Sequence, residues 1–496
     1  MNAQISRISL FALLLLAALI VATTYWQAWA APSLAAKQDN AIQRVAQFRI
    51  KRGLIKAANG TVLAANVRRR VGGETLYFRR YPTHGLASQT IGYSTQGRSR
   101  AGLERSENAY LTASNANLDT IFQKLADNLK GTTIQGNDLV LNLRVNAQKI
   151  AESALRGRCG AAVVLNPKTG QVYVMASSPG YDPNKVESSK GYASILRSPG
   201  ACPGSASPLY NRATQGLYPP GSTFKTVTAA AALDGGVYTL TSPFYDPGYC
   251  TEYGQKVSNA GNPEAPEAFG HVDFLQAYQH SINAVFCNIG MKLGAKRILD
   301  EAKKFGFYSK PPIDLPDSEV APSGEYGANH RPFDDPGRVD PGRVAFGQDK
   351  LIASPLQMAL VAAAVANGGT IMVPHLVRRV TTQSGKTVVD VKPQVWRRAM
   401  KPSTAADLNQ MMQAVVNGGT GGAAQIPGVK VAGKTGTAET GDNPYYDAWF
   451  IFFAPADNPV VAGAVVVEHV PNGFGGAVSA PIAKQLMQAL LPPASK

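Results

Sequence analysis

A serine and a lysine three residues apart are the side chains in this sequence best suited to covalent chemistry. Ser222 and Lys225 follow residues 218–221 (Tyr-Pro-Pro-Gly), which end any preceding element, and a run of alanines comes after them. Residues three apart lie on one face of a helix. A serine nucleophile needs an adjacent base, and a lysine serves where burial disfavours its charged form. The spacing therefore predicts an activated nucleophile at the start of an apolar helix, where the helix dipole favours negative charge.

Two later motifs supply side chains that such a nucleophile needs. Ser281-Ile282-Asn283 offers a hydroxyl and an amide, and Lys434-Thr435-Gly436-Thr437 offers a cation beside two hydroxyls. Taken singly, each motif is weak, because Ser106-Glu107-Asn108 and Lys168-Thr169-Gly170 repeat them. An isolated Ser-x-x-Lys would also fit an N-cap serine followed by a surface lysine. The order of the motifs and their expected structural context favour the set formed by Ser222–Lys225, Ser281–Asn283 and Lys434–Thr437. Both repeats precede Ser222, and the second repeat lies in an expected turn.

The ordered triple resembles the active-site motifs of penicillin-binding proteins and serine β-lactamases. Residues 174–184 and 347–358 are similar to stretches that accompany the motifs in these proteins. Residues 52–55 (Arg-Gly-Leu-Ile) and 102–104 (Gly-Leu-Glu) resemble the amino-terminal module of class B, monofunctional penicillin-binding proteins. The interval 32–144 looks too short for the glycosyltransferase domain of class A members. The resemblance is therefore to class B, and it covers nearly all of the chain beyond its amino-terminal apolar run.

This resemblance implies a serine D,D-transpeptidase acting on the D-Ala-D-Ala end of a peptidoglycan stem peptide. Ser222 would attack the carbonyl between the two D-alanines while Lys225 takes its proton. Ser281 would relay a proton towards the leaving amine, together with Lys434. Asn283 would hold the peptide amide and help to position Lys225. An amine of a neighbouring stem would then attack the acyl-enzyme to form the cross-link, and β-lactams would acylate the same serine as covalent inhibitors.

The third motif, by the same resemblance, binds the substrate. Thr435 and Thr437 would bind the terminal carboxylate, aided by the charge of the motif lysine. The backbone N–H groups of Ser222 and Thr437 would form the oxyanion hole. Gly436 would let the substrate backbone approach, and the strand over 431–437 would offer an edge for an extended peptide. No cofactor and no metal is implied.

Other functions stay open beside the transpeptidase. A serine β-lactamase needs a base that activates water, and Glu264 and Glu267 precede Ser281 in a loop without a feature that promotes either of them. A D,D-carboxypeptidase differs only in its acceptor, so the motifs do not separate it. A catalytically idle scaffold or β-lactam sensor is a further class. The intact motifs speak against idleness, and no cytoplasmic signalling domain precedes Arg7.

The order of expected elements predicts an α+β fold. Strands are expected early in the second part of the chain and again at its end, with helices between them, which suggests one antiparallel sheet shared by both ends. The resemblance implies a penicillin-binding, β-lactamase-like domain with helices on both sides of that sheet. The expected strands cover 161–165, 171–176, 429–437, 449–454 and 460–470, and the main helices cover 146–155, 274–280, 284–293, 355–366, 405–416 and 482–491, with loops over 188–203, 242–270 and 311–341.

The amino terminus predicts a membrane anchor. Residues 8–22 are almost wholly apolar, long enough to span a bilayer, and are followed by aromatic residues suited to the interface. Arg7 on the amino side suggests that this end is cytoplasmic. The alternative is a cleaved signal peptide with Ala28-Trp29-Ala30 as its cleavage site. We favour the uncleaved anchor, which predicts a single-pass plasma-membrane protein with its catalytic domain on the outer face.

The remaining chain divides into two expected parts behind the anchor of residues 1–31. Residues 32–145 read as an elongated, β-rich, non-catalytic pedestal that serves interactions, and residues 146–496 read as the transpeptidase domain. The net charge of +16 is concentrated between Arg44 and Arg105. Nucleic acid is implausible outside the membrane, so an anionic wall or lipid surface is the expected partner, with a merely solvated basic face as the alternative. Proteins of a division or elongation complex are further expected partners.

Four cysteines fit an exported protein. Cys159, Cys202, Cys250 and Cys287 are even in number and lack the Cys-x-x-Cys spacing of metal sites. They allow three pairings, and proximity in sequence favours Cys250 with Cys287 and Cys159 with Cys202. Buried free thiols are the alternative.

Overall fold

The computed structural model describes residues 2–25, 47–115, 120–121, 124–125, 129, 133–197, 202, 207–260, 266–441 and 444–492. The first helix, α1 (Asn2–Thr24), contains a segment, Ser6–Thr24, that is long and apolar enough to cross a membrane, and none of it is buried. The alternative cleavage site at Ala28-Trp29-Ala30 and the acidic Glu264 lie outside the described residues.

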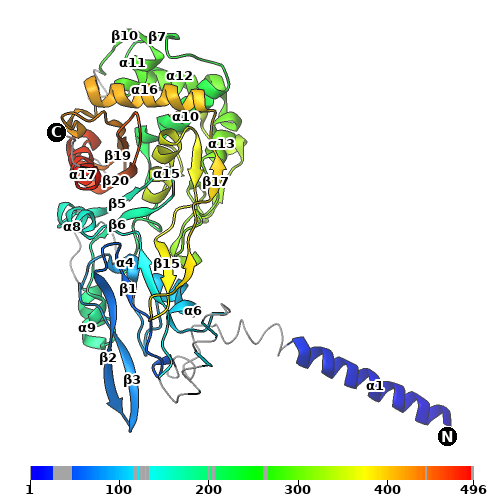
Figure 1. Ribbon diagram of the computed structural model, residues 1–496. Coiled ribbons are helices and arrows are strands. Elements are labelled where there is room, and N and C mark those ends of the chain that lie inside the picture. The colour runs from blue at the N-terminus through cyan, green and yellow to red at the C-terminus, as the bar shows by residue number, and fades with distance from the viewer. Residues whose placement is uncertain are drawn as a thin grey trace.

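A five-stranded antiparallel sheet forms the centre of the upper part of the molecule, here called the head (Figure 1). Its strand order is β18 (Ala432–Glu439), β19 (Tyr445–Ala454), β20 (Val461–Pro471), β5 (Cys159–Leu165) and β6 (Val172–Ser178). Strands from both ends of the domain therefore share one sheet, which confirms the prediction. The inner strands are almost continuously apolar, because helices cover both of their faces.

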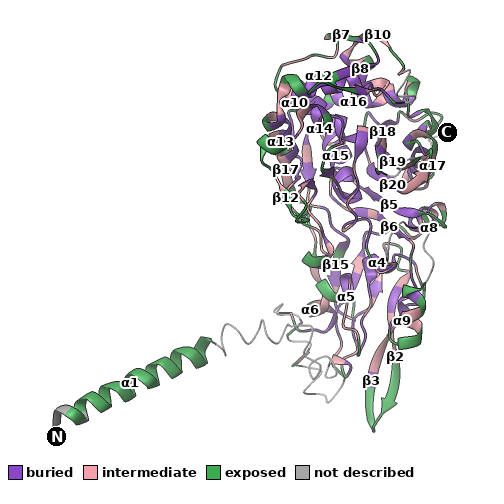
Figure 2. Ribbon diagram, turned by 180° about the vertical axis from the view of Figure 1, so that it is seen from behind, coloured by how far each residue is buried: buried purple, intermediate pink, exposed green. Residues whose placement is uncertain are grey.

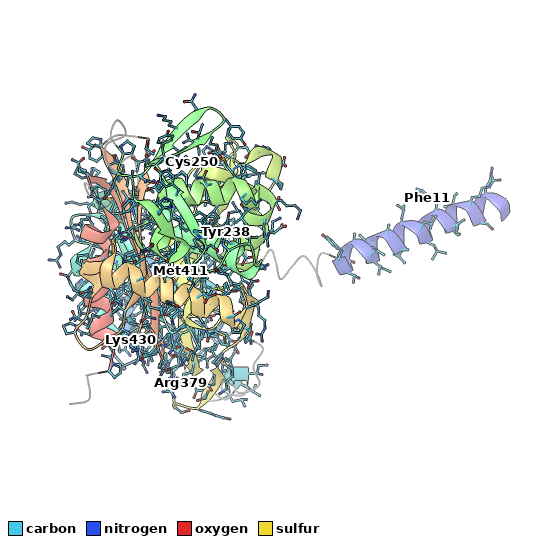
Figure 3. The ribbon with its side chains drawn as sticks, turned by 90° about the horizontal axis from the view of Figure 1, so that it is seen from above. Phe11, Tyr238, Cys250, Arg379, Met411 and Lys430 are labelled. Atoms are coloured by element: carbon cyan, nitrogen blue, oxygen red, sulfur yellow. A yellow bond between two sulfur atoms is a disulfide. The ribbon has the colours of Figure 1, made fainter. Side chains whose placement is uncertain are left out.

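Helices on the two faces of this sheet bury two separate hydrophobic cores. On one face lies α15 (Pro355–Ala366), whose twelve residues are all buried. On the other face, α17 (Gly475–Leu490) and α8 (Val145–Ala154) pack against the sheet and each other. Beyond α15, α16 (Pro402–Gly418) runs across the head in the view from above and carries the buried Met411 (Figure 3). Helix α10 (Lys225–Asp234) packs against α16 and is itself buried along most of its length.

A second sheet builds the pedestal, the narrower lower part in Figures 1 and 2. Its strand order is β16 (Thr387–Asp390), β15 (Val377–Thr381), β4 (Asp138–Leu141), β1 (Ile55–Lys56), β2 (Val62–Val71) and β3 (Glu74–Arg80). The predicted hairpin at Asn59-Gly60 joins β1 to β2, which pair antiparallel. The structure adds a feature that the sequence did not indicate, because β15 and β16 come from far beyond residue 145. Strand β15 pairs with β4 from Val377↔Leu141 to Thr381↔Asp138.

The two short motifs of the pedestal meet in one buried cluster of charges. Arg52 donates to Glu104 with Nη2 2.8 Å from Oε2, and the Nε of Arg79 lies 2.5 Å from Oε1 of the same carboxylate. The three side chains are 4%, 0% and 1% exposed for Arg52, Glu104 and Arg79. Burial alone would raise the pKa of Glu104, but Arg79 and Arg52 hold it below its ordinary value. The cluster explains why an Arg-Gly-Leu-Ile and a Gly-Leu-Glu segment both occur in this module.

Replacing the carboxylate of this cluster should unfold the pedestal more readily. Glu104→Gln leaves two buried guanidinium groups without an anion, which typically costs about 3–5 kcal/mol. The Glu104 contribution is present above the ordinary glutamate pKa and is lost as the pH falls through the lowered folded value. Denaturant unfolding of the full chain measures the loss. Glu74→Gln is the matched control, because the ion pair of Glu74 with Arg49 is exposed and should be worth about 0–1 kcal/mol. Equal stability losses in the two variants would contradict the cluster's role.

All three segments that we expected to be loops contain regular structure, including 311–341, where β11 (Gly324–Tyr326) pairs with β12 (Pro332–Phe333). Helix α9 (Ser189–Leu196) lies within 188–203 and starts at the N-cap Ser188, whose side chain accepts a hydrogen bond from the N–H of Gly191. Within and just beyond the interval 242–270, β8 (Tyr249–Glu252) and β9 (Gln255–Ser258) form a hairpin, and the flanking strands β7 (Pro243–Asp246) and β10 (Gly270–Asp273) pair antiparallel. The loop predictions were wrong there because four-residue strands bounded by Gly and Pro carry almost no periodic signal.

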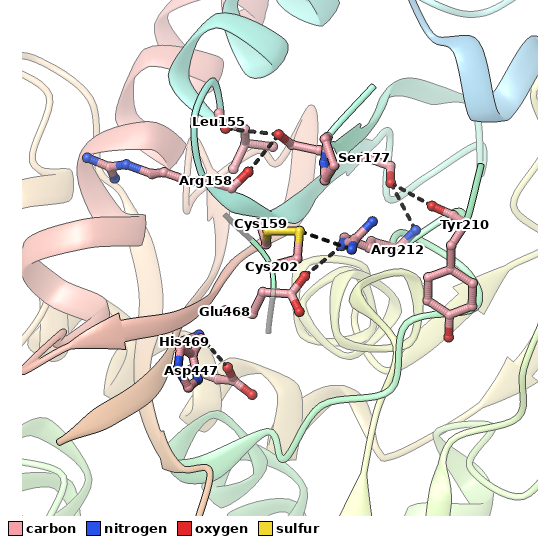
Figure 4. The surroundings of a disulfide bond; sticks show 12 residues. Leu155, Arg158, Cys159, Ser177, Cys202, Tyr210, Arg212, Asp447, Glu468 and His469 are labelled. Carbon is pink, nitrogen blue, oxygen red and sulfur yellow. Dashed lines mark hydrogen bonds and ion pairs between the residues drawn. A yellow bond between two sulfur atoms is a disulfide. The ribbon is translucent and has the colours of Figure 1, made fainter. Parts of the chain in front are cut away.

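One disulfide precedes the catalytic helix α10 in the chain, and the other follows it. Cys250 of β8 is bonded to Cys287 of α12 (Asn283–Leu293), and Cys159 of β5 is bonded to Cys202. Beside the second bond, the buried Arg212 donates from Nη2 to the Sγ of Cys202 at 3.2 Å and from Nε to Oε1 of Glu468 at 2.7 Å (Figure 4). The guanidinium thus ties the disulfide to the end of β20.

Candidate active site

Ser222 lies on a tight turn that is held against the edge of the main sheet. The turn, η3 (Gly221–Phe224), is a 3-10 helix, and the α-helix α10 begins only at Lys225. In a 3-10 helix residues three apart are eclipsed, so Ser222 and Lys225 still share a face, as the spacing predicted. Gly221 has a φ of 51°, which favours glycine, and its N–H donates to the carbonyl of Gly347 at 3.0 Å. The serine hydroxyl is half-buried.

Lys225 is fully buried and anchored to the second motif. Its Nζ donates to the carbonyl oxygen of Ser281 at 2.6 Å and to Oδ1 of Asn283 at 2.7 Å, and lies 3.3 Å from Oγ of Ser281. Burial and then the nearby charge of Lys434 hold the pKa of Lys225 well below its ordinary value. Among the described residues no carboxylate forms an ion pair with this lysine. A neutral amine has two N–H donors, so the two short bonds leave its lone pair available.

Ser281 sits between two lysine amines. It separates α11 (Phe274–Gln279) from α12 and adopts a φ of 61°, an uncommon conformation for a residue with a side chain. Lys434 donates from Nζ to the Oγ of Ser281 at 2.8 Å and to the carbonyl of Thr435 at 3.1 Å. Burial lowers the pKa of Lys434 to about 7. The hydroxyl of Ser281 therefore connects Lys434 of the sheet to Lys225 of the helix.

The rest of the third motif lies on β18, the edge strand of the main sheet. Thr435 is only 6% exposed, and its Oγ1 lies 2.5 Å from Oγ1 of Thr420. Thr437 is half-buried, and its Oγ1 accepts a weak bond from the N–H of Gly475 at 3.4 Å. In the part of the chain that the structure describes, β18 pairs with β19 alone, so its outer edge is unpaired beside η3. Such an edge suits an extended peptide.

Gly436 has a packing role in the structure. A Cβ at this position would lie 2.8 Å from the carbonyl oxygen of Pro220 and 3.0 Å from Cγ2 of Thr223. The glycine therefore lets the nucleophile turn pack directly on β18, which sets the distance between the first and third motifs. The expectation that Gly436 also lets a substrate backbone approach stays a prediction.

The comparisons with known proteins agree with this geometry. Residues 160–488 match the penicillin binding protein transpeptidase domain, and residues 52–139 match the penicillin binding protein A dimerisation domain. The chain is 33% identical to the peptidoglycan D,D-transpeptidase PbpA of Mycolicibacterium smegmatis, and the match covers 99% of each chain. The chain belongs to the class B penicillin-binding proteins.

Solved structures of this class share the fold along most of its length. Penicillin-binding protein A of Mycobacterium tuberculosis, as an imipenem acyl-enzyme complex, has a TM-score of 0.77 and 32% identity, covering 89% of this chain and 99% of that one. The D,D-transpeptidase domain of a peptidoglycan glycosyltransferase from Eggerthella lenta has a TM-score of 0.74 and 31% identity, covering 89% and 98%. The α+β fold with an antiparallel sheet between helices is thereby confirmed for this class B penicillin-binding protein.

Three residues near the site of this class B protein were missed from sequence. Thr420 follows α16 in a glycine-rich segment, and only its contact with Thr435 reveals it. Phe474 is 53% exposed and directly precedes Gly475, the donor to Thr437. Trp449 donates from Nε1 to the carbonyl of Pro219 at 2.9 Å and so braces the segment before the nucleophile. None of the three carries a motif, and each is found only by proximity in space.

Proposed function

We propose that this protein is a peptidoglycan D,D-transpeptidase that cross-links stem peptides through an acyl-enzyme on Ser222. The observation that carries the proposal is the buried amine of Lys225, which lies one 3-10 turn from Ser222 and has its two short hydrogen bonds to the second motif. The related mycobacterial PbpA forms an acyl-enzyme with imipenem. A β-lactam would likewise acylate Ser222 here.

Acylation follows from the protonation states of the two lysines. Burial and the charge of Lys434 lower the pKa of Lys225 and so favour its neutral form, whose lone pair accepts the Ser222 proton as the oxygen attacks the carbonyl between the two D-alanines. The backbone N–H groups of Ser222 and Thr437 stabilise the oxyanion, where one donor is typically worth about 2.7–4 kcal/mol. Ser281, between Lys225 and Lys434, delivers a proton to the departing D-alanine amine.

Recognition of the terminal carboxylate depends on Lys434. With a pKa of about 7 the free enzyme holds this amine partly protonated at neutral pH. An approaching carboxylate favours the charged form, so substrate binding and protonation of Lys434 reinforce each other. Thr435 and Thr437 supply hydroxyl donors on the same strand, and Asn283 binds the peptide amide while it holds Lys225 in place.

The second half-reaction uses an amine from a neighbouring stem rather than water. Among the described residues no Asp or Glu side chain is hydrogen-bonded to Lys225, Ser281 or Lys434. These residues therefore offer no bonded carboxylate beside the three motif side chains that would activate a water for hydrolysis. Glu267 is exposed, and its carbonyl rather than its carboxylate accepts from Asn259. These features favour transpeptidation over β-lactamase activity.

We further propose the division into anchor (1–31), pedestal (32–145) and transpeptidase domain (146–496). The family match at 52–139 supports the pedestal, and the match at 160–488 supports the transpeptidase domain. Helix α1 spans the plasma membrane once with Arg7 inside, and the catalytic part lies on the outer face, where two disulfides persist. Proteins of a division or elongation complex bind the pedestal.

Product analysis tests this function. The purified full-length protein is incubated with a stem-peptide donor and an amine acceptor, and the products are separated by mass. We expect a cross-linked dimer as the main product. A shortened peptide without dimer would mean a D,D-carboxypeptidase, and rapid turnover of penicillin would mean a β-lactamase.

A further inference from the structure

Among the described residues of the pedestal, four lysines and arginines form ion pairs with carboxylates: Arg49, Arg52, Lys56 and Arg79. Arg52 and Arg79 are buried against Glu104, and Lys56 forms an ion pair with Asp138 at 2.7 Å. These ion pairs account for only part of the basic charge between Arg49 and Arg105. Four exposed arginines of the β2–β3 hairpin have no acidic partner among the described residues: Arg68, Arg69, which lies over the ring of Phe78 at 5.2 Å, Arg70 and Arg80.

The end of this hairpin combines positive charge with an apolar residue. Strands β2 and β3 are joined by Gly72-Gly73, whose φ values of 58° and 84° suit a two-residue hairpin turn. Val71, immediately before the turn, is 51% exposed. Glu74 is the hairpin's one acidic residue, and Arg49 already neutralises it at 2.6 Å. Because successive side chains of a strand point to opposite faces, Arg68, Arg69 and Arg70 present charge on both faces of the ribbon.

The hairpin lies where the chain enters the pedestal from the direction of α1. The carbonyl of Phe48 accepts a bond from the N–H of Tyr77 at 2.7 Å, and the rings of Phe48 and Phe78 are 5.4 Å apart. Twenty-one residues of the sequence separate Tyr25, at the end of α1, from Gln47, at the start of the described pedestal. The hairpin projects at the end of the molecule opposite to α16 and the active-site head (Figures 1 and 2). With α1 in the membrane as proposed, this end of the pedestal would face the bilayer.

We propose that the tip of the β2–β3 hairpin docks on anionic phospholipid headgroups at the outer face of the plasma membrane. Guanidinium groups bind phosphate oxygens through paired N–H donors, and a basic segment beside a negatively charged bilayer is attracted within a Debye length. Val71 adds an apolar contact that is favourable with lipid but not with a soluble, polar wall polymer. We therefore assign lipid as the binding partner. The inference rests on the proposed orientation of α1, and it fixes the tilt of the pedestal above the bilayer.

A thiol at the tip tests this docking. All four native cysteines form disulfides, so Val71→Cys in the full-length protein can be labelled alone with a polarity-sensitive fluorophore. The labelled protein is reconstituted in nanodiscs of neutral phosphatidylcholine or with added phosphatidylglycerol. We expect a blue-shifted emission, quenched by spin-labelled lipid, in the anionic discs alone. The signal should vanish at 1 M salt, where the Debye length is about 3 Å.

Removal of the arginines makes the test specific. Each charge beside an anionic surface contributes about fivefold to binding, so Arg68→Gln with Arg69→Gln and Arg70→Gln should weaken docking about 100-fold. The control removes the same charge from the exposed Arg378, Arg379 and Arg398 and should leave the signal intact. An equal signal in neutral discs, persistence in the hairpin variant, or a response only to soluble anionic polymer would overturn the proposal.

The experiment also separates this inference from the function on which it rests. All variants should retain penicillin labelling and remain bound to the discs through α1. Loss of the protein from the discs would overturn the anchoring, and the docking with it. Loss of penicillin labelling in the hairpin variant would show that the substitutions disturb the fold, so Arg68→Lys with Arg69→Lys and Arg70→Lys, which keeps the charge, must restore both labelling and the lipid signal. Failure to restore the signal would overturn the electrostatic docking.

Discussion

Ser222→Ala should abolish covalent labelling by a fluorescent penicillin. The substitution removes the one oxygen that forms the acyl bond, and it leaves the turn intact because the side chain is small and half-buried. Labelling of purified full-length protein, read after denaturing electrophoresis, gives the result directly. The expected loss is complete within detection, because Ser222 is the hydroxyl that lies one 3-10 turn before Lys225, and the other hydroxyl near this lysine, Ser281, accepts from Lys434.

The control for this prediction is a serine away from the site. Ser194→Ala, on the exposed side of α9, should label at the rate of the unchanged protein. Thermal unfolding of both variants checks that the fold is retained. Undiminished labelling of Ser222→Ala would end the assignment of the nucleophile.

Lys225→Met should slow acylation by a factor of about 10²–10⁴, the usual contribution of a general base. Methionine keeps the length and burial of the side chain but has no lone pair of comparable basicity. Stopped-flow acylation by a chromogenic β-lactam measures the rate, and mass spectrometry detects slow adduct formation. Normal acylation rates in a folded Lys225→Met protein would remove this residue as the base.

The pH dependence of acylation by the unchanged enzyme is a second test of Lys225 as the base. The free base is the active form, so acylation should rise with pH through the folded pKa of Lys225 and then level off, below the pH where an ordinary lysine titrates. Lys292→Met, on an exposed part of α12, should leave both rate and pH profile unchanged. A profile that rises only near the ordinary lysine pKa would contradict the buried, neutral amine.

The catalytic motifs were predictable because their chemistry restricts residue type and spacing. Ser222 and Lys225 share a face after one turn of either a 3-10 helix or an α-helix, so their spacing alone predicts that they lie together. The continuous apolar runs of β19 and β20 are compatible with few structures other than buried strands. The α15 boundaries were predicted to the residue because Ser354 caps the helix and a glycine pair follows Asn367.

What the sequence did not predict depends on contacts between distant segments. Thr420 is found near the site only through its contact with Thr435, fifteen residues away. Gly436 lies against the carbonyl of Pro220, which is far from it in the sequence. The four-residue strand β8 is held by the bond of Cys250 to Cys287 rather than by its own propensity. Local patterns carry no record of such pairings, because the energy that favours them appears only after the chain has folded.

The insertion of β15 and β16 into the pedestal sheet bears on any attempt to study the catalytic half by itself. A fragment that begins near residue 146 would lack β4, and the backbone of β15 from Val377 to Thr381 would lose one of its two hydrogen-bonded neighbours and keep only β16. A bare strand edge of this kind recruits other chains, so such a fragment is expected to aggregate. Inhibitor screening and crystallisation should therefore start at the pedestal, with residue 47 or earlier as the first residue kept.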